Sequence, residues 1–146
     1  MLGTEPILIE EYVQTGQLRI IFWPVLNHGS PSVYSTLTAE CAGQQNSEHF
    51  WTMHYYLFER SSQLYSADRD FYIQAARNIG LDEELFTTCY DQNIGLDTIK
   101  NLDQIRIDRR VYSQPAFDLN GEFFYSAPAP DRFKTLIETA LNKNSP

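Results

Sequence analysis

Hydrophobic positions recur at helical spacing along much of the chain. Apolar residues three or four positions apart, bounded by capping side chains or by glycine, predict amphipathic helices rather than strands. The middle of the chain is therefore predicted to be helical. The predicted helices cover residues 6–14, 32–42, 47–59, 70–79, 82–89, 97–109 and 130–141, with Ser47 and Asp82 as N-caps.

Two other segments have the composition of strands. Residues 18–25, "LRIIFWPV", are rich in β-branched and aromatic side chains and predict a buried strand that ends at Pro24. Residues 116–125 predict a hairpin, because Asn120-Gly121 supplies the positive φ angles of a type I′ turn. The order of elements predicts an α/β layer fold, with helices on a small mixed sheet. A chain of 146 residues is expected to form a single domain.

Composition and charge exclude several classes of function. The formal net charge of −8, without a basic run, argues against nucleic acid as a partner. No apolar run is long enough for membrane insertion, and no signal peptide is recognisable, so a cytoplasmic location is expected for the chain as written. Histidines and cysteines are too dispersed for a metal site, and we expect no cofactor and no hydrolase triad.

Several short motifs resemble those of the DsbA-like branch of the thioredoxin superfamily. They are "AECA" at 39–42, "FWTMHYYLF" at 50–58, "NIGLDEELFTTC" at 78–89, and the hairpin that follows a proline. The resemblance covers about residues 5–141. It implies a thioredoxin-like fold with a helical insertion at about 32–109 and an N-terminally truncated sheet. Its most specific part, the family-pattern core, is Phe50, Trp51, His54, Leu57 and Phe58, with His54 expected to be half-buried.

Pro115 stands directly before the first hairpin strand. From the residues alone, an ordinary trans proline is the simpler interpretation, because only about 5–6% of X-Pro bonds in folded proteins are cis. The resemblance implies instead that Pro115 is the cis-proline of a peptide-binding loop. It also implies that the backbone of Gln114 faces a bound extended peptide. Gln114 departs from the family, which usually has a smaller residue such as Thr or Val at this position.

Cys41 and Cys89 are the two cysteines of the sequence. The resemblance implies a structural disulfide between them, because some members of the family carry a second disulfide at these places. The alternative is a pair of buried free thiols. A disulfide is favoured in an exported protein, and free thiols are favoured in the cytosol.

The sequence contains no C-x-x-C, the redox motif of the family, so no residue is expected to be catalytic. We expect the chain to act by binding a protein or an extended peptide, or by self-association in a homodimer. Loss of the central strand would leave apolar sheet edges, which a second chain could pair. Two alternatives remain open. One is the major part of a thiol-disulfide oxidoreductase, periplasmic or otherwise extracytoplasmic, whose active-site segment is missing. The other is a glutathione-binding or isomerase relative with a non-cysteine site.

Overall fold

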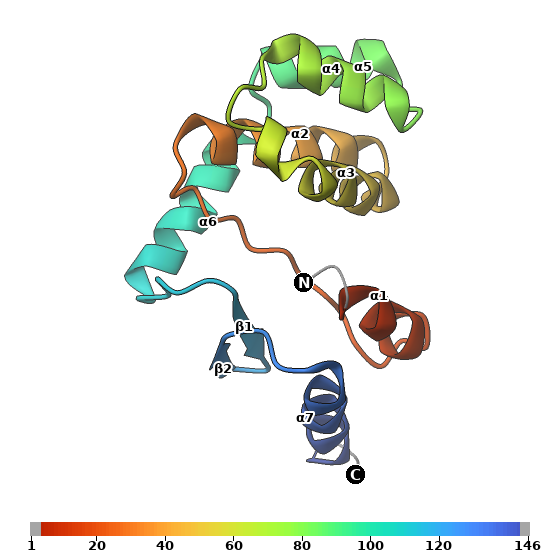
Figure 1. Ribbon diagram of the computed structural model, residues 1–146, viewed down its shortest axis with the longest axis vertical. Coiled ribbons are helices and arrows are strands. Elements are labelled where there is room, and N and C mark those ends of the chain that lie inside the picture. Colours follow the sequence, from red (N-terminus) through yellow and green to blue (C-terminus); the bar gives the residue numbers. More distant parts are fainter. Residues whose placement is uncertain (1–3, 144–146) are drawn as a thin grey trace. The chain divides into compact units, whose positions relative to one another are not determined.

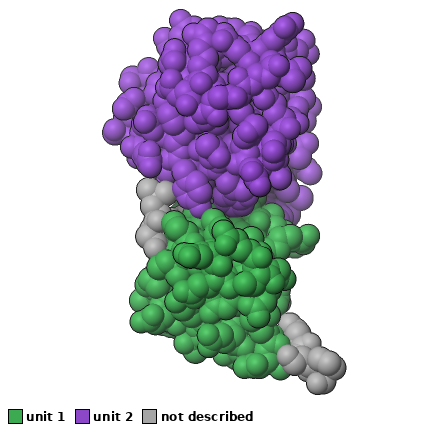
Figure 2. Space-filling view, turned by 90° about the vertical axis from the view of Figure 1, so that its right-hand side faces the viewer, with its two compact units in different colours: residues 1–22, 109–146 green, residues 23–108 purple. Residues whose placement is uncertain are grey.

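The computed structural model describes residues 4–143 (Figure 1). The chain divides into two compact units, one of residues 1–22 with 109–146 and the other of residues 23–108 (Figure 2). The elements of the first unit are α1 (Glu5–Leu8), the π-helix η1 (Ile9–Val13), β1 (Ala116–Leu119), β2 (Glu122–Tyr125) and α7 (Pro130–Lys143). The elements of the second unit are α2 (Ser30–Gln45), α3 (Ser47–Glu59), the 3-10 helix η2 (Ser61–Gln63), α4 (Arg69–Asn78), α5 (Glu83–Asp91) and α6 (Leu96–Asp108).

The described residues of the second unit form helices that pack around α2. Leu37 and Cys41 lie at the centre of its core and are almost completely buried. Large side chains from neighbouring helices complete this core, among them Met53, Tyr72 and Phe86. The helical periodicity of the sequence is confirmed here, because the apolar stripes of the amphipathic helices meet in one cluster.

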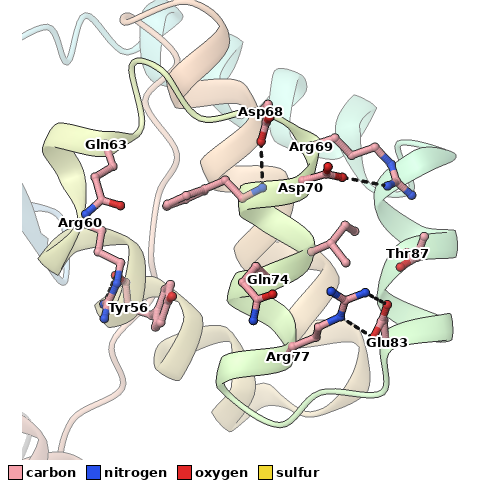
Figure 3. A pocket seen from close by; sticks show the side chains of 12 residues that line it. Tyr56, Arg60, Gln63, Asp68, Arg69, Asp70, Gln74, Arg77, Glu83 and Thr87 are labelled. Carbon is pink, nitrogen blue, oxygen red and sulfur yellow. Dashed lines mark hydrogen bonds and ion pairs between the residues drawn. The ribbon is translucent and has the colours of Figure 1, made fainter.

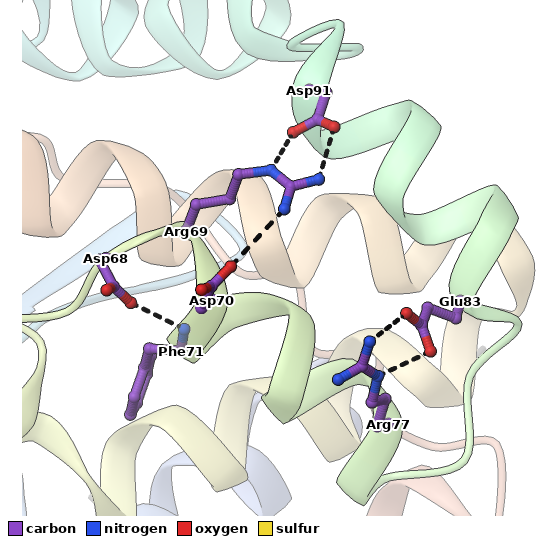
Figure 4. A network of polar contacts seen from close by, with 7 residues as sticks. All are labelled: Asp68, Arg69, Asp70, Phe71, Arg77, Glu83 and Asp91. Carbon is purple, nitrogen blue, oxygen red and sulfur yellow. Dashed lines mark hydrogen bonds and ion pairs between the residues drawn. The ribbon is translucent and has the colours of Figure 1, made fainter.

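Side-chain caps set where three of these helices begin. The Asp82 carboxylate accepts a hydrogen bond from the backbone N of Leu85, which confirms the predicted cap of α5. The cap predicted at Ser47 is wrong by one residue. Asn46 caps α3 instead, because its side chain accepts from the backbone N of Glu48. Asp68 caps α4 in the same way through Phe71 (Figure 4).

The first unit has its own small core between the hairpin and the helices. Leu8 and Tyr12 from the N-terminal helices pack with Phe133 and Ile137 of α7. Phe117 of β1 adds its ring to this cluster, with its centroid 4.8 Å from that of Phe133. One face of the hairpin is therefore fixed on helices from both ends of the chain.

The predicted hairpin is confirmed, including its turn. β1 and β2 are antiparallel, and Asp118 lies opposite Phe123 in their register. Asn120 and Gly121 both have positive φ, at 53° and 94°, as a type I′ turn requires. The backbone N of Gly121 donates to Oδ1 of Asp118 at 2.6 Å and closes the turn.

The strand predicted at residues 18–25 is wrong, because this segment has no regular secondary structure. A strand needs a partner for its backbone hydrogen bonds, and the sheet of the described residues contains β1 and β2 alone. The sheet is consequently antiparallel and not mixed. Hydrogen bonds to α6 hold the end of the segment and the residue that follows it: Trp23 Nε1 donates to the carbonyl of Leu102 at 2.9 Å, and the backbone N of Leu26 donates to Asp103 at 3.3 Å.

Candidate functional site

The Gln114–Pro115 peptide bond is cis and stands at the entrance to β1. Pro115 is half-buried, whereas Gln114 is exposed. The carbonyl of Pro115 accepts a hydrogen bond from the backbone N of Ser126 at 3.0 Å, which extends the pairing of the hairpin by one bond. The loop that the sequence singled out is therefore fixed to a strand that packs on the core of its unit.

Polar contacts between η1 and α7 reinforce the core on which the hairpin packs. Nζ of Lys134 on α7 donates to Glu11 at 2.5 Å, and the Tyr12 hydroxyl donates to Glu138 at 3.2 Å. Burial, and secondarily the charge of Glu138, raises the pKa of Tyr12, so this phenol stays protonated and remains a donor at neutral pH. These bonds join η1 to α7.

The opposite face of the hairpin carries exposed aromatic rings. Phe123 is 39% exposed and Tyr125 is 53% exposed, and their rings stack with centroids 6.5 Å apart and an interplanar angle of 20°. Tyr125 lies opposite Ala116, the residue that follows Pro115, and Phe123 lies opposite Asp118. We name Ala116, Asp118, Phe123 and Tyr125 the outer hairpin face. Sequence analysis did not single it out, although strand alternation places these four residues on one side.

Cys41 on α2 and Cys89 on α5 form a disulfide. Both side chains are buried, with 1% and 4% of their surface exposed, and neither cysteine is free. The disulfide interpretation is thus the one that the structure supports, rather than that of two thiols. A buried disulfide between two helices offers no accessible thiolate for attack on another disulfide.

The residues of the family-pattern core lie along α3 but are not equally buried. His54 and Leu57 are 4% and 3% exposed, so the histidine is buried rather than half-buried. Phe50 packs against the main core, Trp51 is half-buried, and Phe58 is 39% exposed although its ring lies 4.5 Å from that of His54. Burial lowers the pKa of His54 to about 4, which keeps its imidazole neutral at pH 7.

A surface hollow of about 750 Å³ lies between α3, α4 and α5 (Figure 3). Three arginines line it, and each has a carboxylate partner. Arg69 forms two hydrogen bonds of 2.7 Å with Asp91, and Arg77 is bidentate with Glu83 (Figure 4). Arg60 stacks 3.8 Å over the Tyr56 ring and is bonded to Glu59.

The ion pairs of Arg69 and Arg77 join α4 to α5, and the positive and negative side chains that line the hollow balance each other. The hydrogen bonds from arginine lower the pKa of Asp91 and that of Glu83. Sequence spacing could not reveal the Arg69–Asp91 pair, because it depends on how two separate helices pack. We assign no ligand to the hollow.

The predicted residues fall into two groups that belong to different units. Gln114 and Pro115 lie in the first unit, whereas the cysteines and the family-pattern core lie in the second. Within the described residues, no group of three or more His, Cys, Asp or Glu side chains could hold a metal ion. None of the helices between residues 4 and 143 is both long enough and apolar enough to span a bilayer.

A protein-family model described as Thioredoxin matches residues 4–139. The chain therefore belongs to the thioredoxin family. Neither the curated proteins nor the solved structures contain a match to it. Family membership confirms the thioredoxin part of the predicted fold, in a chain whose described residues are mostly helical with a small antiparallel sheet.

Proposed function

We propose that this chain is a DsbA-like member of the thioredoxin family that binds extended polypeptides at the Gln114–Pro115 loop. The observation that carries the proposal is the position of this loop. An exposed residue and a cis proline lead directly into β1, which pairs only with β2 among the described residues. A strand edge beside an exposed loop suits an added peptide strand, whose main chain would supply most of the binding energy.

The 146 residues do not support dithiol-disulfide exchange of the usual kind. That reaction needs a thiolate to attack and a second cysteine to resolve the mixed disulfide. Both cysteines of this sequence are consumed in a buried disulfide, and no C-x-x-C is present. Binding is therefore the activity that we assign to these residues.

Peptide binding can be tested by titrating the protein with a short fluorescent peptide of alternating Thr and Gln and measuring anisotropy. Pro115→Ala should weaken binding, because it frees the φ angle that the proline ring fixes at the point where the loop enters β1. Pro128→Ala, which replaces a proline between β2 and α7, is the matched control and should leave binding unchanged. Equal affinities of the wild type and Pro115→Ala would refute the proposal.

Self-association is the second part of the proposal. Residues 18–25 have strand-like composition but form no strand, and Ile21 is 65% exposed. A second copy of the chain could supply the missing strand partner in a symmetric homodimer. Sedimentation velocity over a range of concentrations should show a dimer that Ile21→Lys dissociates. A monomer at every concentration would contradict it.

A second candidate function is thiol-disulfide oxidoreductase activity, with redox cysteines supplied from outside these 146 residues. Membership of the thioredoxin family favours it. The Cys41–Cys89 disulfide also supports an oxidising, extracytoplasmic compartment for the protein under either candidate. Intact mass and N-terminal sequencing of the protein from its native source would distinguish them. A longer species with a C-x-x-C would favour the oxidoreductase.

A further inference from the structure

The outer hairpin face combines two chemical features that suit a cation. Phe123 and Tyr125 present stacked, exposed rings, and the Asp118 carboxylate stands on the neighbouring strand. Directly opposed residues of an antiparallel pair have Cβ atoms about 5 Å apart, so Asp118 and the Phe123 ring are neighbours. An aromatic ring attracts a cation to its face, and a carboxylate attracts the same charge.

We infer that the outer hairpin face binds a lysine or arginine side chain of the extended polypeptide. This inference rests on the proposed function for its occupant. The inference specifies a basic polypeptide. Its positive side chains stand at every second position, because alternate residues of an extended strand share one face. The net charge of −8 attracts such a peptide over longer distances.

Position along the hairpin links this face to the loop. Tyr125 lies opposite Ala116, and Ala116 follows the cis proline directly. Asp118 is two residues further along β1, which corresponds to about 7 Å at the rise of a strand. A peptide of a few residues that pairs beside Gln114 therefore reaches the outer hairpin face with its neighbouring side chains.

The test compares two fluorescent peptides of equal length, one alternating Lys with Thr and the other alternating Gln with Thr, against the full chain at physiological salt. The Lys peptide should bind about fivefold more tightly, the combined effect of one exposed cation–π contact and one surface ion pair. Asp118→Asn and Tyr125→Leu should each reduce the affinity for the Lys peptide about twofold, because each removes one of the two contacts. Neither should change the affinity for the Gln peptide.

The variants are chosen to keep the hairpin folded. Asp118→Asn retains an oxygen that can accept from Gly121, and Tyr125→Leu retains apolar bulk. Glu10→Gln, at an exposed position of η1, is the matched control because it removes the same charge from a residue outside the outer hairpin face. If Glu10→Gln reduces the affinity for the Lys peptide as much as Asp118→Asn does, the attraction is non-specific and the inference is overturned.

Pro115→Ala separates the two proposals. Loss of affinity for both peptides, combined with equal binding of Lys and Gln peptides to the wild type, would keep the proposed function and overturn the cationic site. A Lys preference that depends on Asp118 but not on Pro115 would support the cationic site and refute binding at the loop. If neither peptide binds, both the proposed binding at the loop and the cationic site are refuted.

Discussion

Nε of Arg106 donates a hydrogen bond of 2.7 Å to Oδ1 of Asp103, one helical turn earlier on α6. The two side chains are 9% and 13% exposed, and the same oxygen accepts from the backbone N of Leu26. Asp103 thus connects the segment before α2 to α6.

Replacement of Asp103 by alanine should lower the free energy of unfolding by about 2 kcal/mol, because the buried guanidinium of Arg106 and the backbone N of Leu26 each lose a hydrogen bond to its carboxylate. Urea unfolding followed by circular dichroism would measure the loss. Asp97→Ala, at an exposed position of the same helix, should cost clearly less. Equal losses of unfolding free energy in the two variants would mean that the hydrogen bonds of Asp103 contribute nothing to stability.

Removal of the disulfide by Cys41→Ala with Cys89→Ala should destabilise the oxidised protein by about 4 kcal/mol in the chain-entropy model, since the bond closes a loop over 48 positions. The comparison is made by urea unfolding without reductant. Under reducing conditions most of the difference should disappear. Intact mass of the wild type, measured before and after reduction, should increase by two hydrogens.

The two faces of the hairpin should respond differently to truncation. Phe117→Ala removes a ring that packs on Phe133 and should cost about 2 kcal/mol, whereas Phe123→Ala removes an exposed ring and should cost much less. Amide hydrogen exchange of β1 and β2 is the direct measurement. Equal acceleration of exchange by both substitutions would contradict the described packing.

Stability should fall as the pH decreases through the titration of His54. The pKa of this side chain is lowered by burial from its ordinary value of 6.5 to about 4, so the unfolded chain takes up a proton that the folded chain refuses. The loss begins near pH 6.5, reaches about 3 kcal/mol and levels off below about pH 4. His54→Leu should remove this part of the pH dependence, whereas His28→Gln, in an exposed loop, should retain it.

The ion pairs between α4 and α5 should be visible in carboxylate titrations. Arg77→Met removes the hydrogen bonds that lower the pKa of Glu83, so this pKa should rise toward its usual range. Since a lowered pKa stabilises the fold above the pKa of the unfolded chain, this contribution is lost as the pH falls. Carbon-detected NMR would follow Glu83, with Arg69→Met as control, which should raise the pKa of Asp91 instead.

Local patterns predicted the elements whose partners lie nearby. Helical periodicity and capping residues located the helices within a few residues of their observed bounds, because those bonds form inside each segment. The type I′ turn was readable from Asn120-Gly121 for the same reason. Ser47 was mistaken for a cap because Asn46 and Ser47 are both good capping residues and only the backbone conformation decides between them.

Residues 18–25 show where local patterns fail. Their composition is that of a strand, yet strand formation depends on a partner ladder that the described residues do not provide. Hydrogen bonds from Trp23 and Leu26 to α6 hold the end of the segment without regular secondary structure. The β-propensity of these side chains therefore does not by itself make residues 18–25 a strand.

The sequence by itself determined the helical periodicity, the hairpin, the acidic charge and the absence of a C-x-x-C. Each of these is a property of neighbouring residues or of composition. Only the tertiary structure decided that Cys41 meets Cys89, that Arg69 pairs with Asp91, and that Phe117 is covered while Phe123 is exposed. Such contacts depend on how distant segments pack, because side chains far apart in sequence interact only after the backbone has brought them within a few ångströms.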